Sequence, residues 1–219
     1  MMKHNRIFLI ACWLCFVLIG QFLKFSIPVG EQSASLSCLA IALPLLACFL
    51  PARISLPIIS GLWLTLHAFH PIPLTMGIPT LLAALSWRIS KNSAGVNRLF
   101  HLALPAAAII AFAFSSSGAD AWPYTLYWLI PMACTFFKPS LFSRALQSTF
   151  MAHAAGSLIW AYFVPLSGAQ WLALIPVVAL ERLLAAGVAM ALVKTLSALE
   201  VSLPNMLLSL KKRTLSVES

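Results

Sequence analysis

Charged residues are scarce in this sequence, and acidic residues are the scarcest. Asp and Glu together number 5 and Lys and Arg 14, so that 9% of the 219 residues are charged while 61% are hydrophobic. In an ordinary soluble domain about a quarter of the residues are charged, and the mean hydropathy of this chain is +0.95. These values exclude an ordinary soluble domain, a disordered chain and a receptor with a large extramembrane domain. We predict an all-α polytopic membrane protein, with residues 1–200 forming a single transmembrane helical domain.

Several catalytic motifs are also missing. The sequence has no phosphate-binding G-x-x-x-x-G-K-[ST], no dinucleotide-binding G-x-G-x-x-G and no hydrolase-type G-x-S-x-G. An ATP-driven motor within this chain is therefore disfavoured. Four of the five acidic residues fall in expected loops or tails, which leaves Glu181 alone and little material for paired-carboxylate catalysis. We expect transport or binding rather than catalysis.

Basic residues are present in excess and give a formal net charge of +9. They lie at the ends of apolar runs, where the positive-inside rule places cytoplasmic loops, so we expect a lipid bilayer and no nucleic acid as partner. The connections 115–121 and 165–170 contain no Lys or Arg. We therefore expect both termini in the cytoplasm and the chain in a bacterial plasma (inner) membrane. The expected inside segments carry Arg88, Lys91 and Arg98, then Lys138 and Arg144, then Lys211, Lys212 and Arg213.

Apolar runs mark the expected spans, because about 20 apolar residues cross a bilayer. We interpret the first run as an uncleaved helix, since it exceeds the length of a signal-peptide core and no clear A-x-A cleavage site follows it. Six transmembrane helices plus a proline-broken hairpin fit the loop charges, and eight spans fit them equally well. The expected spans are at about 7–23, 36–50, 57–70, 77–88, 99–116, 122–137, 143–164 and 170–194, followed by a basic cytoplasmic tail at 201–219.

Prolines interrupt the stretch that follows His70. Pro71, Pro73 and Pro79 remove backbone donors and disfavour a helical conformation in the residues before them. One straight helix is therefore improbable, and we expect two helices or a re-entrant hairpin. Because broken backbone at membrane depth is tolerated only against protein or a water-filled cavity, residues 67–80 are a leading place for a site.

Two of the five histidines precede this break. His67 and His70 are three residues apart and share a helix face, so they can bind one metal ion if His153 or Glu181 completes the ligand set. The H-x-x-H pattern is common by chance, however, and no H-E-x-x-H is present. The cofactor is thus unknown and none is the leading expectation, while a metal- or haem-binding enzyme or redox subunit remains an alternative.

Polar residues recur at helical spacing in the span at 143–164. Thr149, His153, Ser157 and Trp160 are separated by four, four and three residues, which places them along one stripe. Facing lipid, the stripe would leave four polar groups without partners, so we expect it to face the interior or a cavity. There it can bind a solute, relay a proton, or simply hydrogen-bond between helices.

Glu181 and Arg182 form the charged pair expected deep in the membrane. A charge there costs about 2.5 to 3.5 kcal/mol on insertion scales, which makes both residues functional candidates. Because adjacent positions on a helix are about 100° apart, we expect each side chain to find a partner on another helix. Glu181 would contact a substrate, metal or proton and Arg182 an anionic group; an interhelical polar clamp is the structural alternative.

Aromatic residues gather near the expected outer ends of the spans. Tyr124, Tyr127 and Trp128 stand at i, i+3 and i+4 and so share one helix face. They are explained either by the aromatic belt of the headgroup region or by an outward-facing pocket that stacks on a planar or cationic solute.

Together these features favour a permease or the membrane-embedded substrate-binding component of a small-solute transporter. Vitamin-binding subunits of energy-coupling transporters have a comparable size and about six spans, an analogy of architecture without a shared motif. Other membrane subunits or a nucleotide-hydrolysing subunit would be partners of such a component. A non-catalytic membrane assembly subunit is a further alternative.

Overall fold

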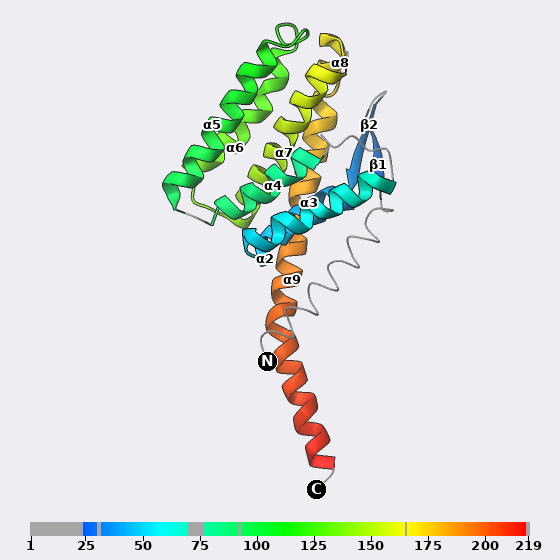
Figure 1. Ribbon diagram of the computed structural model, residues 1–219, viewed down its shortest axis with the longest axis vertical. Coiled ribbons are helices and arrows are strands. Elements are labelled where there is room, and N and C mark those ends of the chain that lie inside the picture. The colour runs from blue at the N-terminus through cyan, green and yellow to red at the C-terminus, as the bar shows by residue number, and fades with distance from the viewer. Residues whose placement is uncertain (1–23, 30–31, 70–76, 92, 165, 218–219) are drawn as a thin grey trace.

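The computed structural model describes residues 24–29, 32–69, 77–91, 93–164 and 166–217, and these are helical apart from one β-hairpin (Figure 1). The predicted helical class is thereby confirmed. The hairpin consists of β1 (Lys24–Val29) and β2 (Gln32–Ser37). The α-helices are α2 (Cys38–Phe49), α3 (Ala52–Phe69), α4 (Gly77–Ile89), α5 (Ala94–Ala113), α6 (Leu129–Ala133), α7 (Leu141–Phe163), α8 (Gly168–Ala173) and α9 (Ile175–Val217). The 3₁₀ helices are η2 (Trp122–Trp128) and η3 (Cys134–Phe136).

The β-hairpin replaces the polar connection that we expected from residue 24 to residue 35. Its strands are antiparallel, with Lys24 opposite Ser37 and Val29 opposite Gln32. In β1 the apolar residues alternate with Ser26 and Pro28, which are both exposed. This alternation has the period of two that is typical of a strand with one polar face.

Helix α7 is the central element, because it contacts α4, α5, α6 and α9. Ser140 caps its N-terminus: the Ser140 hydroxyl accepts from the Ser143 backbone N–H at 3.0 Å, and the Ser143 hydroxyl accepts from the Ser140 N–H at 2.9 Å. Small side chains then line the buried positions of the helix and let its neighbours approach closely. These buried small residues are Ala145, Ser148, Ala154, Ala155, Ser157 and Ala161.

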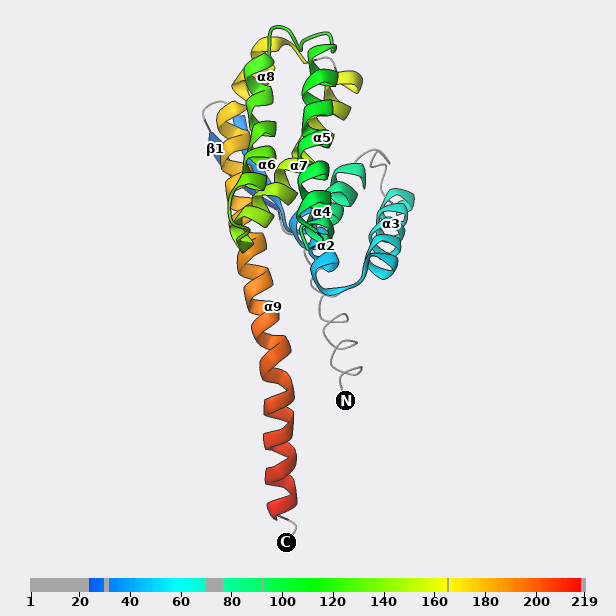
Figure 2. The same ribbon diagram turned by 90° about the vertical axis from the view of Figure 1, so that its left-hand side faces the viewer.

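Helices α3 and α4 are separate, as the prolines predict, and residues 70–76 between them lie outside the described residues. At the start of α4, a Cβ added to Gly77 would lie 3.3 Å from Cγ of Trp63. The missing side chain therefore allows α4 to begin close against α3. Figure 1 shows α3 at a steep angle to α5 and α9, and Figure 2 shows α3 and α9 on opposite sides of the molecule.

The apolar interior is divided into two clusters. The first joins α2, α3, α4 and the middle of α9 around Leu43, Ile59 and Trp87. The second joins α5, η2, the second half of α7, α8 and the start of α9, and it is rich in aromatic residues. Its largest members are Phe112, Tyr124, Trp128 and Trp171.

Two helices in the described part of the chain are long and apolar enough to cross a membrane. They are α5, at Ala94–Ala113, and the first part of α9, at Ile175–Ala198. A shorter apolar stretch covers Ala40–Phe49 in α2. The expected span at 122–137 is divided among η2, α6 and η3, and the one at 170–194 includes α8 as a separate short helix.

His101 is a buried polar link between α5 and α4. Its Nε2 lies 2.7 Å from Oγ of Ser86, and its Nδ1 lies 2.9 Å from the carbonyl oxygen of Asn97. A carbonyl oxygen can only accept, so in the neutral ring Nδ1 carries the proton and the Ser86 hydroxyl donates to Nε2. Both ring nitrogens of His101 are thus satisfied.

His101→Leu is expected to lower the free energy of unfolding by about 1 to 3 kcal/mol, because it leaves the buried Ser86 hydroxyl without this partner. Thermal unfolding of the purified protein in detergent measures the change. Ser90→Ala is the matched control, since the Ser90 hydroxyl bonds only the Trp87 carbonyl of its own helix end, at 2.9 Å. Equal stability of the two variants would contradict the assignment.

Candidate functional site

An aromatic cluster lies between α5, η2, α7 and α8. We use this name for seven residues whose rings contact one another at centroid distances of 4.8 to 6.4 Å. Most of these pairs meet edge to face, the arrangement that aromatic quadrupoles favour. The members are Phe112, Tyr124, Tyr127, Trp128, Phe150, His153 and Trp171.

Tyr124 is the central ring of the aromatic cluster. Its centroid is 4.8 Å from that of Trp171, 5.4 Å from that of His153 and 6.4 Å from that of Trp128. Only 2% of Tyr124 is exposed, and Trp128 is fully buried. One short segment therefore supplies the centre of the cluster.

The local conformation of η2 explains how this segment places Tyr124 at the centre of the aromatic cluster. Pro123 stands in the first turn, where its fixed φ suits a helix start. A 3₁₀ helix has three residues per turn, which aligns Tyr124 with Tyr127. The Tyr127 hydroxyl donates to the Ile175 carbonyl and so connects η2 to the beginning of α9. Tyr124 contacts both Tyr127 and Trp128, for which we predicted a shared face on an α-helix, but in this 3₁₀ helix only Tyr124 and Tyr127 are aligned.

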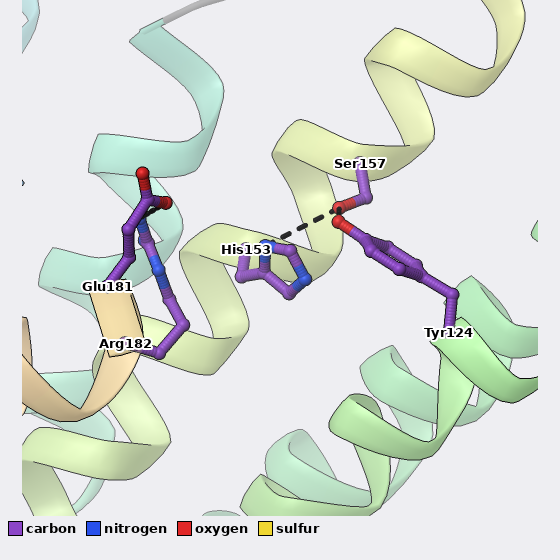
Figure 3. A network of polar contacts seen from close by, with 5 residues as sticks. All are labelled: Tyr124, His153, Ser157, Glu181 and Arg182. Carbon is purple, nitrogen blue, oxygen red and sulfur yellow. Dashed lines mark hydrogen bonds and ion pairs between the residues drawn. The ribbon is translucent and has the colours of Figure 1, made fainter. Parts of the chain in front are cut away.

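A short polar chain runs from α7 into the cluster (Figure 3). Oγ of Ser157 lies 3.2 Å from the Tyr124 hydroxyl and 3.5 Å from Nδ1 of His153. His153 and Ser157 thus face the interior, as their spacing predicts. Thr149 on the same stripe is half-buried.

Trp160 does not join the other residues of the stripe, because it is 41% exposed. It lies in the last turn of α7 on an exposed side of the helix, whereas Ala161 in the same turn is buried. Tyr162 and Phe163 in the same turn are also exposed, at 56% and 75%. The expectation that the whole stripe faces the interior is therefore wrong at its C-terminal end.

Glu181 and Arg182 pair with each other, with 3.2 Å between Oε2 of Glu181 and Nη2 of Arg182. This contact differs from our expectation of separate partners on other helices. Both side chains are long enough to curl across the angle between their helix positions. They are largely buried, with exposed fractions of 17% for Glu181 and 23% for Arg182.

The ion pair stands beside the aromatic cluster. Figure 3 shows His153 between the pair on α9 and the Ser157–Tyr124 contact. Along α9 the pair falls between Val178 of the second apolar cluster and Ala185 of the first. The charges therefore lie in the interior, where the two clusters meet.

Unpaired polar atoms are concentrated in this region. Buried polar groups in proteins are nearly always hydrogen-bonded, and each exception costs about 1 to 3 kcal/mol. Such exceptions in the described ranges also occur at scattered positions, on Ser55, Trp63, Asn97 and Arg144. Around the aromatic cluster, the buried atoms without a hydrogen-bond partner among the described residues are Nε1 of Trp128, Nε1 of Trp171, Nε2 of His153 and Nε of Arg182.

Of the three histidines predicted to bind a metal ion, the structure describes the side chain of His153. In the portion that the structure describes, no group of three or more His, Cys, Asp or Glu side chains is placed to hold a metal ion. His153 contacts aromatic rings and Ser157. The side chain of His67 and the whole of His70 lie outside the described residues, so the predicted His67–His70–His153 site stays a prediction.

Phe112, Phe150 and Trp171 belong to the site, although we did not predict them as site residues. Phe150 stands three residues before His153 on the same helix, so its spacing could have identified it. Trp171 is positioned by α8, which Ser167 and Gln170 begin with a capping box. Phe112 carries no local signal, because its contacts are made with η2 and α8.

No known protein family matches this chain, and neither a curated protein nor a solved structure matches it. The interpretation of the site therefore depends on its own geometry.

Proposed function

We propose that this chain is a multi-pass protein of the bacterial plasma (inner) membrane and serves as a permease, or as the substrate-binding component of a transporter, for a small solute. The composition and the two long apolar helices α5 and α9 support the membrane location. Six spans plus a broken hairpin, or eight spans, remain the proposed topologies.

The distribution of charge at the two ends of α5 supports the proposed orientation. At its beginning, the Arg98 guanidinium lies 5.9 Å from the centre of the Phe136 ring, so the first turns of α5 lie beside η3. The connections that adjoin these two elements carry Lys91 and Lys138. At the other end, a Cβ added to Gly168 would lie 2.6 Å from Cβ of Asp120, so the two loops without Lys or Arg also meet. By the positive-inside rule the basic end would face the cytoplasm.

The observation that carries the binding function is the contrast between two buried histidines. Both ring nitrogens of His101 have partners, as expected of a structural link between helices. Nδ1 of His153 makes one long hydrogen-bond contact, to Oγ of Ser157 at 3.5 Å. The buried Nε2 of His153 has no hydrogen-bond partner within the described ranges. A purely structural role leaves that atom unexplained, whereas a solute in the site would satisfy it.

In the proposed mechanism a solute enters from the end that carries Asp120 and meets the rings of η2 and α8. His153 and Arg182 then hold its polar groups between the two apolar clusters. Proton coupling through His153 and Glu181 is a further proposal, which uptake that does not respond to external pH or to loss of the proton gradient would remove.

The function is tested by thermal-shift screening of the purified full chain against amino acids, vitamins and metal ions. At least one solute is expected to raise the melting temperature. His153→Gln is expected to weaken binding of that solute at least tenfold, because a flexible amide replaces an imidazole that the rings of Tyr124, Tyr127 and Phe150 hold in place.

Ser148→Ala is the matched control on the same helix. The Ser148 hydroxyl donates to the Ala83 carbonyl at 3.0 Å and so joins α7 to α4 outside the aromatic cluster. The variant is expected to lose stability and to keep its affinity. A protein that no solute stabilises, or equal affinity of His153→Gln and the wild type, would favour the alternative of a membrane assembly subunit.

A further inference from the structure

The unpaired atoms around the aromatic cluster also indicate what kind of solute fits there. We propose, on the basis of the solute-binding function above, that the site takes a flat ring compound bearing a carboxylate or a similar group of hydrogen-bond acceptors, and that it discriminates against cations.

The hydrogen-bonding character of the unpaired atoms is the first argument. An indole N–H can only donate, and every guanidinium nitrogen of arginine is a donor. Trp128, Trp171 and Arg182 therefore offer three donors that lack acceptors among the described residues, while Nε2 of His153 can take either role. A molecule that supplies hydrogen-bond acceptors would pair with these three donors.

The positions of these donors form the second argument. The rings of Trp128, Trp171 and His153 all contact the ring of Tyr124. Figure 3 shows Arg182 on the other side of His153 from Tyr124. Three of the four unpaired atoms thus belong to side chains around one buried tyrosine and the fourth lies beyond His153, so one small molecule would meet several of them.

Charge is the third argument. A carboxylate beside Arg182 would form a charge-assisted hydrogen bond, which is about twice as strong as a neutral one. Oε2 of Glu181, the carboxylate oxygen nearest to this guanidinium, already pairs with Nη2 of Arg182. Of the four unpaired atoms, only Nε2 of His153 could accept from a cationic solute, which would leave the indole N–H groups unpaired.

Ring shape is the fourth argument. Two pairs in the cluster lie nearly parallel: Phe112 with Tyr124, at 6.0 Å and 23°, and Tyr127 with Phe150, at 5.8 Å and 20°. The other pairs meet close to edge on. We infer that a flat ring would pack against these rings in the same stacked or edge-to-face positions, which a puckered ring cannot reproduce with a π face of its own.

Four probes of related structure test the solute class: indole-3-carboxylate, indole-3-carboxamide, tryptamine and cyclohexanecarboxylate. A thiol-reactive fluorophore can follow thermal unfolding of the full chain, because Cys48 and Cys134 are free and half-buried. Indole-3-carboxylate is expected to raise the melting temperature most, the carboxamide less, and tryptamine and cyclohexanecarboxylate not at all.

The outcomes separate the two proposals. If tryptamine or cyclohexanecarboxylate stabilises the protein best, the solute class is overturned and the binding function stands. If all four probes fail while a solute of another class binds, the class is likewise overturned. If no solute binds in this panel or in the broader screen, both proposals fail.

Trp171→Phe tests the donor argument directly. It keeps an aromatic ring but removes Nε1, and is expected to weaken binding of indole-3-carboxylate about tenfold. Trp63→Phe is the matched control, because its Nε1 is also buried and without a partner in the described residues, but Trp63 packs against the other apolar cluster. Equal affinities of the two variants for indole-3-carboxylate would overturn the role of the indole donor.

Discussion

Arg182→Leu is expected to lower the free energy of unfolding by about 3 to 5 kcal/mol, because it removes the Arg182 guanidinium from the Glu181 carboxylate in the interior. The contact between Nη2 and Oε2 is 3.2 Å long, and the two side chains are 23% and 17% exposed, so bulk solvent does little to replace the lost partner. Denaturant or thermal unfolding in detergent measures the loss.

The double variant Glu181→Leu/Arg182→Leu is expected to recover most of that stability, since it leaves no charge in the interior. Lys194→Leu is the control further along α9, at an exposed position, and is expected to change stability by less than about 0.5 kcal/mol. If the double variant is as unstable as Arg182→Leu, Arg182 stabilises the fold through other contacts and the ion pair is secondary.

The ion pair has a consequence for binding. Pairing within one helix makes the two charges nearly neutral together, which lowers the cost of placing them in the interior. It also occupies Nη2 of Arg182 and leaves Nε without a partner among the described residues. A solute carboxylate would therefore meet an arginine whose position is already held by Glu181.

Features that depend on local pattern could be predicted from the sequence. The scarcity of charge predicted a membrane protein built of helices. Three closely spaced prolines predicted that α3 and α4 are two helices and not one. The spacing of His153 and Ser157 placed both on an interior face, which the contact to Tyr124 bears out. The proline signal and the His153/Ser157 spacing each lie within about ten residues.

Features that depend on distant partners could not be predicted. Ser86, the partner of His101, is on another helix, and nothing near His101 in the sequence indicates that contact. Trp171 joins Tyr124 only because α8 folds back beside η2. The Glu181–Arg182 contact was missed for a different reason, since helix geometry describes the direction of Cβ and not the reach of two long side chains.

Trp128→Ala is expected to lower the free energy of unfolding by about 3 to 5 kcal/mol, the range for truncating a large buried ring. Trp128 is fully buried, and its ring lies 5.4 Å from Phe112 and 6.4 Å from Tyr124, so its loss leaves a cavity beside the centre of the aromatic cluster. Nε1 of Trp128 has no partner in the described residues, so the loss comes from packing and not from a hydrogen bond.

Trp160→Ala is the matched control for this variant, because Trp160 is 41% exposed at the end of α7, and we expect a loss below about 1 kcal/mol. Unfolding of both variants in detergent gives the comparison. Free indole added to Trp128→Ala is expected to restore part of the melting temperature by filling the cavity, and to have no such effect on Trp160→Ala. Equal losses in the two variants would mean that the rings around Tyr124 are loosely packed, and the argument for a shaped aromatic site would then fail together with this prediction.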